Sequence, residues 1–107
     1  MWETTGGSAL AGESSLTAAH REVQEETGIT MPKDSAVLVE TRPWIDHFDD
    51  IWLFRGMFTL SDVVLLEGET CDAMLATADE IIDLWRSGRF VPTDRLDELL
   101  AKIVALC

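Results

Sequence analysis

Apolar residues recur along the chain with two different periods, and these periods predict its secondary structure. The first helical pattern begins at Ser14 or Ser15, either of which can cap a helix, and it stops at Gly28, a residue type that commonly ends one. Three apolar side chains share one face of this segment at helical spacing. They are Leu16, Ala19 and Val23. We therefore predict one amphipathic helix here, packed on a sheet through that face.

Strand-like patterns follow in the middle of the chain. Residues 36–42 and 51–58 alternate between apolar and other side chains, and the polar run 46–50 between them is typical of a hairpin loop. A last short strand is expected over 71–77, whereas 61–66 fits no regular element. The chain is thus expected to form a sheet after its first helix.

The C-terminal third returns to helical spacing. We predict one helix over 78–86, ended by Gly88, and a final amphipathic helix that Thr93 or Asp94 caps and that runs to Leu106. The order of helix, strands, helix and helix predicts an α+β fold.

Length and charge narrow the class of protein. The 107 residues suggest a single domain over 1–107, and 20 acidic against 8 basic residues give a net charge of −12. This acidity argues against binding of duplex DNA. Two cysteines are too few for a disulfide scaffold, and the start Met1-Trp2-Glu3-Thr4 has neither basic nor apolar targeting character. No run is long enough to cross a bilayer, so a cytoplasmic protein is expected.

The first helix carries the most informative chemistry. Glu22, Glu25 and Glu26 fall within a sector of about 100° on its surface. Like charges at these spacings repel, and a hard divalent cation such as Mg²⁺ would remove that repulsion. A solvated acidic face is the alternative. Arg21 beside the cluster favours the cation site, because a guanidinium can orient carboxylates through two hydrogen bonds.

The segment 7–29 resembles the Nudix box of the Nudix (MutT-like) hydrolases. Seven near-fixed positions match, a coincidence expected on the order of once in 10⁸ random segments. The seven are Gly7, Glu13, Arg21, Glu22, Glu25, Glu26 and Gly28, and Val23 and Ile29 fill the two apolar positions of the pattern. The resemblance implies a Nudix-type α/β/α sandwich with a mixed sheet. It also implies a hydrolase of a nucleoside diphosphate linked to another moiety, in which water attacks a phosphorus of the diphosphate with the help of Mg²⁺ or Mn²⁺.

Roles carry over position by position as expectations from the family. The resemblance implies that Glu22, Glu25 and Glu26 bind the metal, together with a carbonyl of Gly6 or Gly7. Glu22, or a carboxylate outside the box, would take the proton from water. Arg21 and Glu13 would orient the ligands.

Candidates outside the box are weaker. Glu67 and Glu69 could supply an additional carboxylate, although exposed loop glutamates are an equally good interpretation. Four further groups have competing explanations. We interpret His47, Asp49 and Asp50 as polar hairpin residues, whereas Trp44 or Phe48 could stack on a base or sugar. We expect Trp52, Phe54 and Trp85 in the core, and we interpret Arg42 and Arg55 as exposed strand arginines rather than phosphate ligands.

The chain departs from the family before the box, where only residues 1–6 precede it. We therefore expect an N-terminally truncated domain that lacks the family's first strands, and a homodimer that covers the open sheet edge. Two alternatives to the hydrolase stay open. One is a non-catalytic nucleotide-binding or regulatory remnant, and the other is an isopentenyl-diphosphate isomerase-like enzyme that would use Cys71. The sequence does not identify the substrate.

Overall fold

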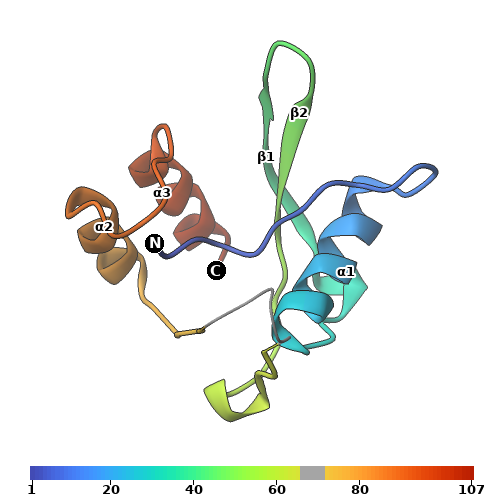
Figure 1. Ribbon diagram of the computed structural model, residues 1–107, viewed down its shortest axis with the longest axis horizontal. Coiled ribbons are helices and arrows are strands. Elements are labelled where there is room, and N and C mark those ends of the chain that lie inside the picture. The colour runs from blue at the N-terminus through green and yellow to red at the C-terminus, as the bar shows by residue number, and fades with distance from the viewer. Residues whose placement is uncertain (66–71) are drawn as a thin grey trace. The chain divides into compact units, whose positions relative to one another are not determined.

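The computed structural model describes residues 1–65 and 72–107, which fold into two compact units. The hairpin unit comprises Thr5–Met74, and the helical unit comprises Met1–Thr4 with Leu75–Cys107. The described residues contain helices and an antiparallel sheet, so the α+β class predicted from the sequence is confirmed. Figure 1 shows the order of these elements along the chain.

Helix α1 (Ser15–Thr27) opens the hairpin unit and matches the predicted bounds. The Ser14 hydroxyl accepts a hydrogen bond from the Thr17 amide at 3.2 Å and thereby caps the first turn. Gly28 ends the helix in the left-handed region with φ of 74°, and its amide donates to the Gln24 carbonyl. A side chain at this position would be strained, which explains why a glycine ends the helix there.

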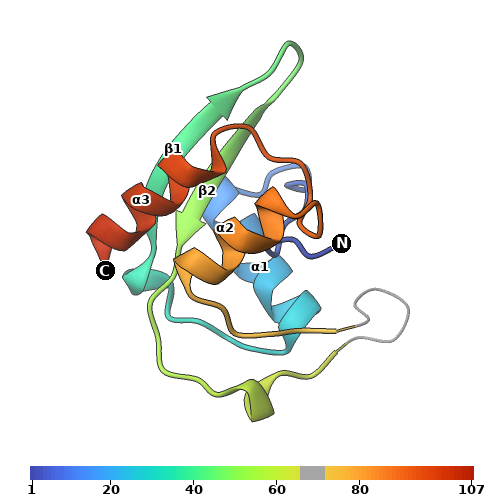
Figure 2. The ribbon, with the colours of Figure 1, turned by 90° about the vertical axis from the view of Figure 1, so that its left-hand side faces the viewer.

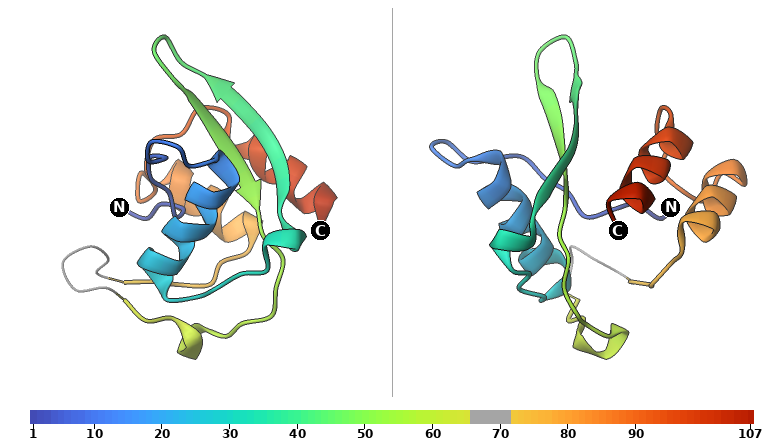
Figure 3. Two further views of the ribbon diagram at one scale, coloured as in Figure 1. Left: turned by 90° about the vertical axis from the view of Figure 1, so that its right-hand side faces the viewer. Right: turned by 180° about the vertical axis from the view of Figure 1, so that it is seen from behind.

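Strands β1 (Val37–Pro43) and β2 (Phe48–Leu53) form an antiparallel hairpin. The pairing runs from Val37 opposite Leu53 to Pro43 opposite Phe48, and a bulge lies between Leu38 and Glu40. The hairpin extends past the end of α1 in both views of Figure 3. Residues Lys33–Ser35 form a short 3₁₀ turn before β1, and Leu60–Asp62 form another after β2.

Two strand predictions need correction. The loop expected over 46–50 is shorter, because the Trp44 amide donates to the His47 carbonyl at 2.8 Å and β2 begins at Phe48. β2 also ends at Leu53, so residues 54–58 are not strand. Within 72–77, the described part of the last expected strand, the backbone is irregular.

Helices α2 (Ala78–Arg86) and α3 (Leu96–Leu106) build the helical unit and lie side by side (Figure 2). α2 has the predicted bounds, and Gly88 follows it with φ of 77°. The start of α3 differs from the prediction, because Arg95 occupies the N-cap in the left-handed region and neither Thr93 nor Asp94 caps the helix. The buried side chains of this unit are Phe90, Leu96, Leu99 and Leu100.

The N-terminal residues belong to the helical unit. Trp2 forms an isolated parallel bridge with Phe90, in which the Trp2 amide donates to the Arg89 carbonyl at 2.8 Å. The Val91 amide donates to the Trp2 carbonyl at 2.9 Å. Among the described residues, strands β1 and β2 pair in antiparallel, whereas the Trp2–Phe90 bridge is parallel.

Candidate functional site

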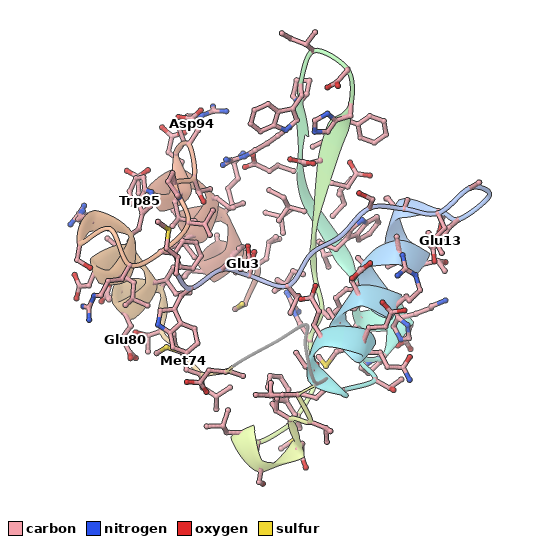
Figure 4. The ribbon with its side chains drawn as sticks, viewed as in Figure 1. Glu3, Glu13, Met74, Glu80, Trp85 and Asp94 are labelled. Carbon is pink, nitrogen blue, oxygen red and sulfur yellow. The ribbon has the colours of Figure 1, made fainter. Side chains whose placement is uncertain are left out.

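A pair of hydrogen bonds joins the helix α1 to the loop before it. The Arg21 guanidinium donates from Nε to Glu13 Oε2 at 2.9 Å and from Nη2 to Glu13 Oε1 at 3.0 Å. The Leu10 amide donates to the same Glu13 Oε1 at 2.9 Å. Glu13 therefore fixes both the arginine and the preceding turn, and Figure 4 shows Glu13 where the loop enters α1.

These contacts favour the charged forms of both side chains. The hydrogen bonds from Arg21, and next the one from the Leu10 amide, lower the pKa of the Glu13 carboxyl from 4.5 to about 2. The hydrogen bonds to Glu13, and then to Glu22, raise the pKa of Arg21 above its ordinary value. Both groups are therefore charged across the neutral range.

Arg21 also contacts two of the glutamates predicted to bind a metal. Its Nη1 donates to Glu22 Oε1 at 2.8 Å and to Glu25 Oε2 at 3.1 Å. Within the described residues, the second oxygen of each of these two carboxylates takes no hydrogen bond. The structure thus brings Glu13, Arg21, Glu22 and Glu25 together, and Glu22 and Glu25 each keep one oxygen outside this network.

The glycine-rich loop lies directly against this cluster. A Cβ atom built at Gly7 would overlap the Glu22 carboxylate, whereas one built at Gly6 would meet open space. The Ser8 carbonyl accepts a hydrogen bond from Arg21 Nη2 at 3.2 Å. The backbone at position 7 can approach Glu22 this closely only because glycine has no side chain.

Burial differs between the two glutamates that Arg21 contacts. The Glu22 side chain is 16 % exposed and that of Glu25 is 48 % exposed. The one buried residue of α1 is Ala18, which lies one helical turn before Glu22. We predicted that Leu16, Ala19 and Val23 would form the packed face, but these three are only half-buried. The buried side of α1 therefore includes Ala18 and reaches the Glu22 carboxylate. Because the Ala18 side chain is small, neighbouring segments can come close to the helix there.

Two longer-range hydrogen bonds fix α1 in the hairpin unit. The Trp52 indole N–H donates to the Ser15 hydroxyl at 3.1 Å, and His20 Nε2 lies 2.7 Å from the Met31 carbonyl. The His20 ring also contacts that of Phe54, with centroids 6.1 Å apart. Trp52 and Phe54 thus pack against α1. The periodicity of the sequence contains no signal for the Ser15 and Met31 contacts, because a hydroxyl and a carbonyl carry no hydrophobic pattern.

The donor chemistry of the cluster fits a hard divalent cation. Carboxylate oxygens are ligands that Mg²⁺ prefers, and Gly7 leaves backbone accessible beside Glu22. In the described part of the chain, no three Asp, Glu, His or Cys side chains converge as they would around a metal ion. Glu22 and Glu25 are instead directed to Arg21. Glu26 lies next to Glu25 on α1, and its role as a ligand stays a prediction.

The remaining predicted site residues lie elsewhere. Glu67, Glu69 and Cys71 fall outside the described residues. Asp49 and Asp50 belong to β2, and His47 stacks on Trp44 at the end of the hairpin. The Arg42 side chain, expected to be exposed, is only 14 % exposed, because it pairs with Glu40 of the same strand.

A glutamate-bearing helix joined through an arginine to a preceding glycine-rich loop defines this site as one of the Nudix type. The family model described as NUDIX domain matches residues 1–105, so the chain belongs to the Nudix family. Its relatives include an uncharacterized Nudix hydrolase of Listeria monocytogenes, 38 % identical over 99 residues, and one of Listeria innocua, 35 % identical over 99 residues.

In both cases the match covers 92 % of this chain and 59 % of the relative. The chain therefore spans about three fifths of the length of these relatives. A comparison with solved structures finds no significant match. Among the described residues, every helix is too short or too polar to span a membrane.

Proposed function

We propose that this protein is a metal-dependent hydrolase of nucleoside diphosphates linked to another moiety. The observation that carries the proposal is the network in which Arg21 contacts Glu13, Glu22 and Glu25 at once. Membership of the Nudix family supports the same activity. The proposed products are a nucleotide and the phosphorylated second moiety.

In this proposal Glu22, Glu25 and Glu26 hold Mg²⁺ or Mn²⁺ together with the Gly7 carbonyl. Such a cation, when bound, would lower the pKa of a water and neutralise charge that develops on the diphosphate. Glu22 is the most buried of the glutamates that Arg21 contacts on α1, and its second oxygen is available to accept a proton from water. Glu25 is more exposed, so a substrate in solution could reach its carboxylate directly.

Arg21 and Glu13 act in the proposal by orienting these carboxylates. Arg21 contacts one oxygen of Glu22 and one of Glu25, which restricts the rotation of both side chains. Glu13 in turn fixes Arg21 through two parallel hydrogen bonds, a geometry that only a guanidinium offers. The loop and the helix thereby form one preorganised group.

The test is a panel of nucleotide sugars, dinucleoside polyphosphates, ADP-ribose and oxidised nucleoside triphosphates with Mg²⁺ or Mn²⁺. We expect Glu25→Gln to abolish the metal-dependent release of nucleotide, whereas Glu98→Gln, on the exposed side of α3, should retain it. Full activity of Glu25→Gln would contradict the metal assignment. Saturable binding of a nucleotide without turnover by the unaltered protein would instead identify a non-catalytic binding module.

A further inference from the structure

The turn of the β1–β2 hairpin exposes large apolar side chains. We call residues 44–50 the hairpin tip. Here Trp44 is 59 % exposed, Ile45 is fully exposed and Phe48 is 63 % exposed. The tip extends beyond α1 within the hairpin unit (Figures 1 and 3). Contiguous apolar side chains at a solvated turn are typical of an interaction surface.

Trp44 is held in one position at this tip. Its indole N–H donates to Asp49 Oδ2 at 2.8 Å, and its backbone amide closes the turn to His47. The His47 ring stacks on it with centroids 5.7 Å apart and an angle of 11° between the planes. An aromatic ring that is both exposed and fixed loses little entropy when a ligand binds to it.

The hairpin tip also contains three aspartates. Asp46 and Asp49 are both exposed, and Asp50 follows in β2. Asp46 Oδ1 accepts from His47 Nδ1, and the Asp46 carboxylate also takes a hydrogen bond from its own backbone amide, yet the side chain stays 84 % exposed. A second copy of a chain with net charge −12 would be repelled here, and so would a nucleotide phosphate. The charge of the tip is complementary to a cation.

We propose that the hairpin tip docks an arginine-rich segment of a partner protein. A guanidinium can stack on the exposed indole of Trp44 and at the same time donate hydrogen bonds to an aspartate at the rim. Ile45 and Phe48 offer apolar surface to the residues that flank the arginine. This surface lies outside the proposed catalytic cluster and requires no metal ion.

The experiment titrates the full chain with a fluorescently labelled peptide of six arginines and measures the dissociation constant by anisotropy. We expect Trp44→Leu and Asp46→Asn each to weaken binding by about two- to fivefold, the range of an exposed cation–π contact or ion pair. Because Asp46 is at the turn and makes no contact between strands, Asp46→Asn tests the proposal even if Trp44→Leu disturbs the hairpin. A six-lysine peptide should bind more weakly than six arginines, since an ammonium does not stack as a plane.

The matched control is Asp97→Asn in α3, which changes the net charge equally at an exposed site in the helical unit. It should leave the dissociation constant unchanged. Equal weakening by Asp97→Asn and Asp46→Asn would overturn the proposal by revealing attraction to the overall charge alone. Binding of AMP or of phosphatidylcholine vesicles in a Trp44-dependent way, without binding of the peptide, would also overturn the proposal. So would a self-association, measured by sedimentation, that Trp44→Leu abolishes. Because Glu25→Gln should bind the peptide normally, the proposal can fail independently of the hydrolase activity.

Discussion

The Arg21 guanidinium and the Glu13 carboxylate face each other in parallel, with both donor–acceptor distances between 2.9 and 3.0 Å. The two residues are eight positions apart, one in α1 and one in the loop that precedes it. Together with the hydrogen bond from Arg21 to the Ser8 carbonyl, this pair fixes the position of the loop relative to the helix. It also determines where the remaining N–H groups of Arg21 point.

The fork geometry predicts that lysine cannot replace arginine here. Arg21→Lys keeps the charge but loses the simultaneous contacts to Glu13, Glu22 and Glu25. We expect Mg²⁺ affinity and hydrolysis to fall by about 10- to 100-fold, as is common when an orienting residue is lost. Calorimetric titration with Mg²⁺ and steady-state kinetics measure the two effects. Unchanged values for both would show that the charge of Arg21 suffices.

The low pKa of Glu13 predicts a loss of stability in acid. A carboxyl whose pKa is lower in the folded than in the unfolded chain stabilises the fold above the unfolded value. For Glu13 that contribution should be complete above about pH 4.5 and should disappear as the pH falls to about 2. Carbon-13 NMR of the metal-free protein can follow its titration. In Arg21→Met the pKa of Glu13 should return toward 4.5, and a value that stays near 2 would contradict the assigned cause.

The close approach of Gly7 to Glu22 predicts unequal effects of two neighbouring substitutions. Gly7→Ala places a Cβ atom on the Glu22 carboxylate and must displace it, whereas Gly6→Ala adds a methyl group in open space. We expect Gly7→Ala to reduce Mg²⁺ affinity by about 10-fold or more, and Gly6→Ala to be near neutral. Calorimetry on both variants checks this difference. Similar affinities for the two variants would refute the contact.

Gly28 and Gly88 allow backbone strain to be separated from a steric clash. Both residues have positive φ, of 74° and 77°, so alanine should cost about 1–2 kcal/mol at either position. At Gly28 the new Cβ would also lie 3.0 Å from Val64 Cβ, whereas at Gly88 it meets open space. Urea unfolding should therefore show a larger loss for Gly28→Ala. The reverse order would contradict the contact with Val64.

The sequence predicted α1 well because both of its ends carry strong local signals. Ser14 caps the first turn through its own hydroxyl, and Gly28 ends the helix through a conformation that glycine favours. The charged cluster followed from the same helix, because residues three and four positions apart share a face. The buried side of α1 was harder to predict from the sequence, since the burial of Ala18 depends on the approach of other segments and not on its own hydrophobicity.

The hairpin and the start of α3 show where local signals fail. Asp49 and Asp50 are polar and favour a loop, but their backbones pair with Arg42 and Thr41 in β1. Cross-strand pairing overrides the intrinsic preference of a single residue. Similarly, Arg95 adopts the left-handed conformation before α3 although Asp94 is the better capping residue by type. Neither the strand pairing nor the conformation of Arg95 leaves a periodic pattern in the sequence.

One arginine among Glu13, Glu22 and Glu25 has a consequence for electroneutrality. One guanidinium faces three carboxyl groups, so the formal charges of this group sum to two negative units. One divalent cation would bring the group to zero, whereas one Na⁺ or K⁺ would leave it anionic. In the proposed metal site, the number of carboxylates around Arg21 would thus favour a divalent over a monovalent ion, independently of the size and geometry of its coordination sphere.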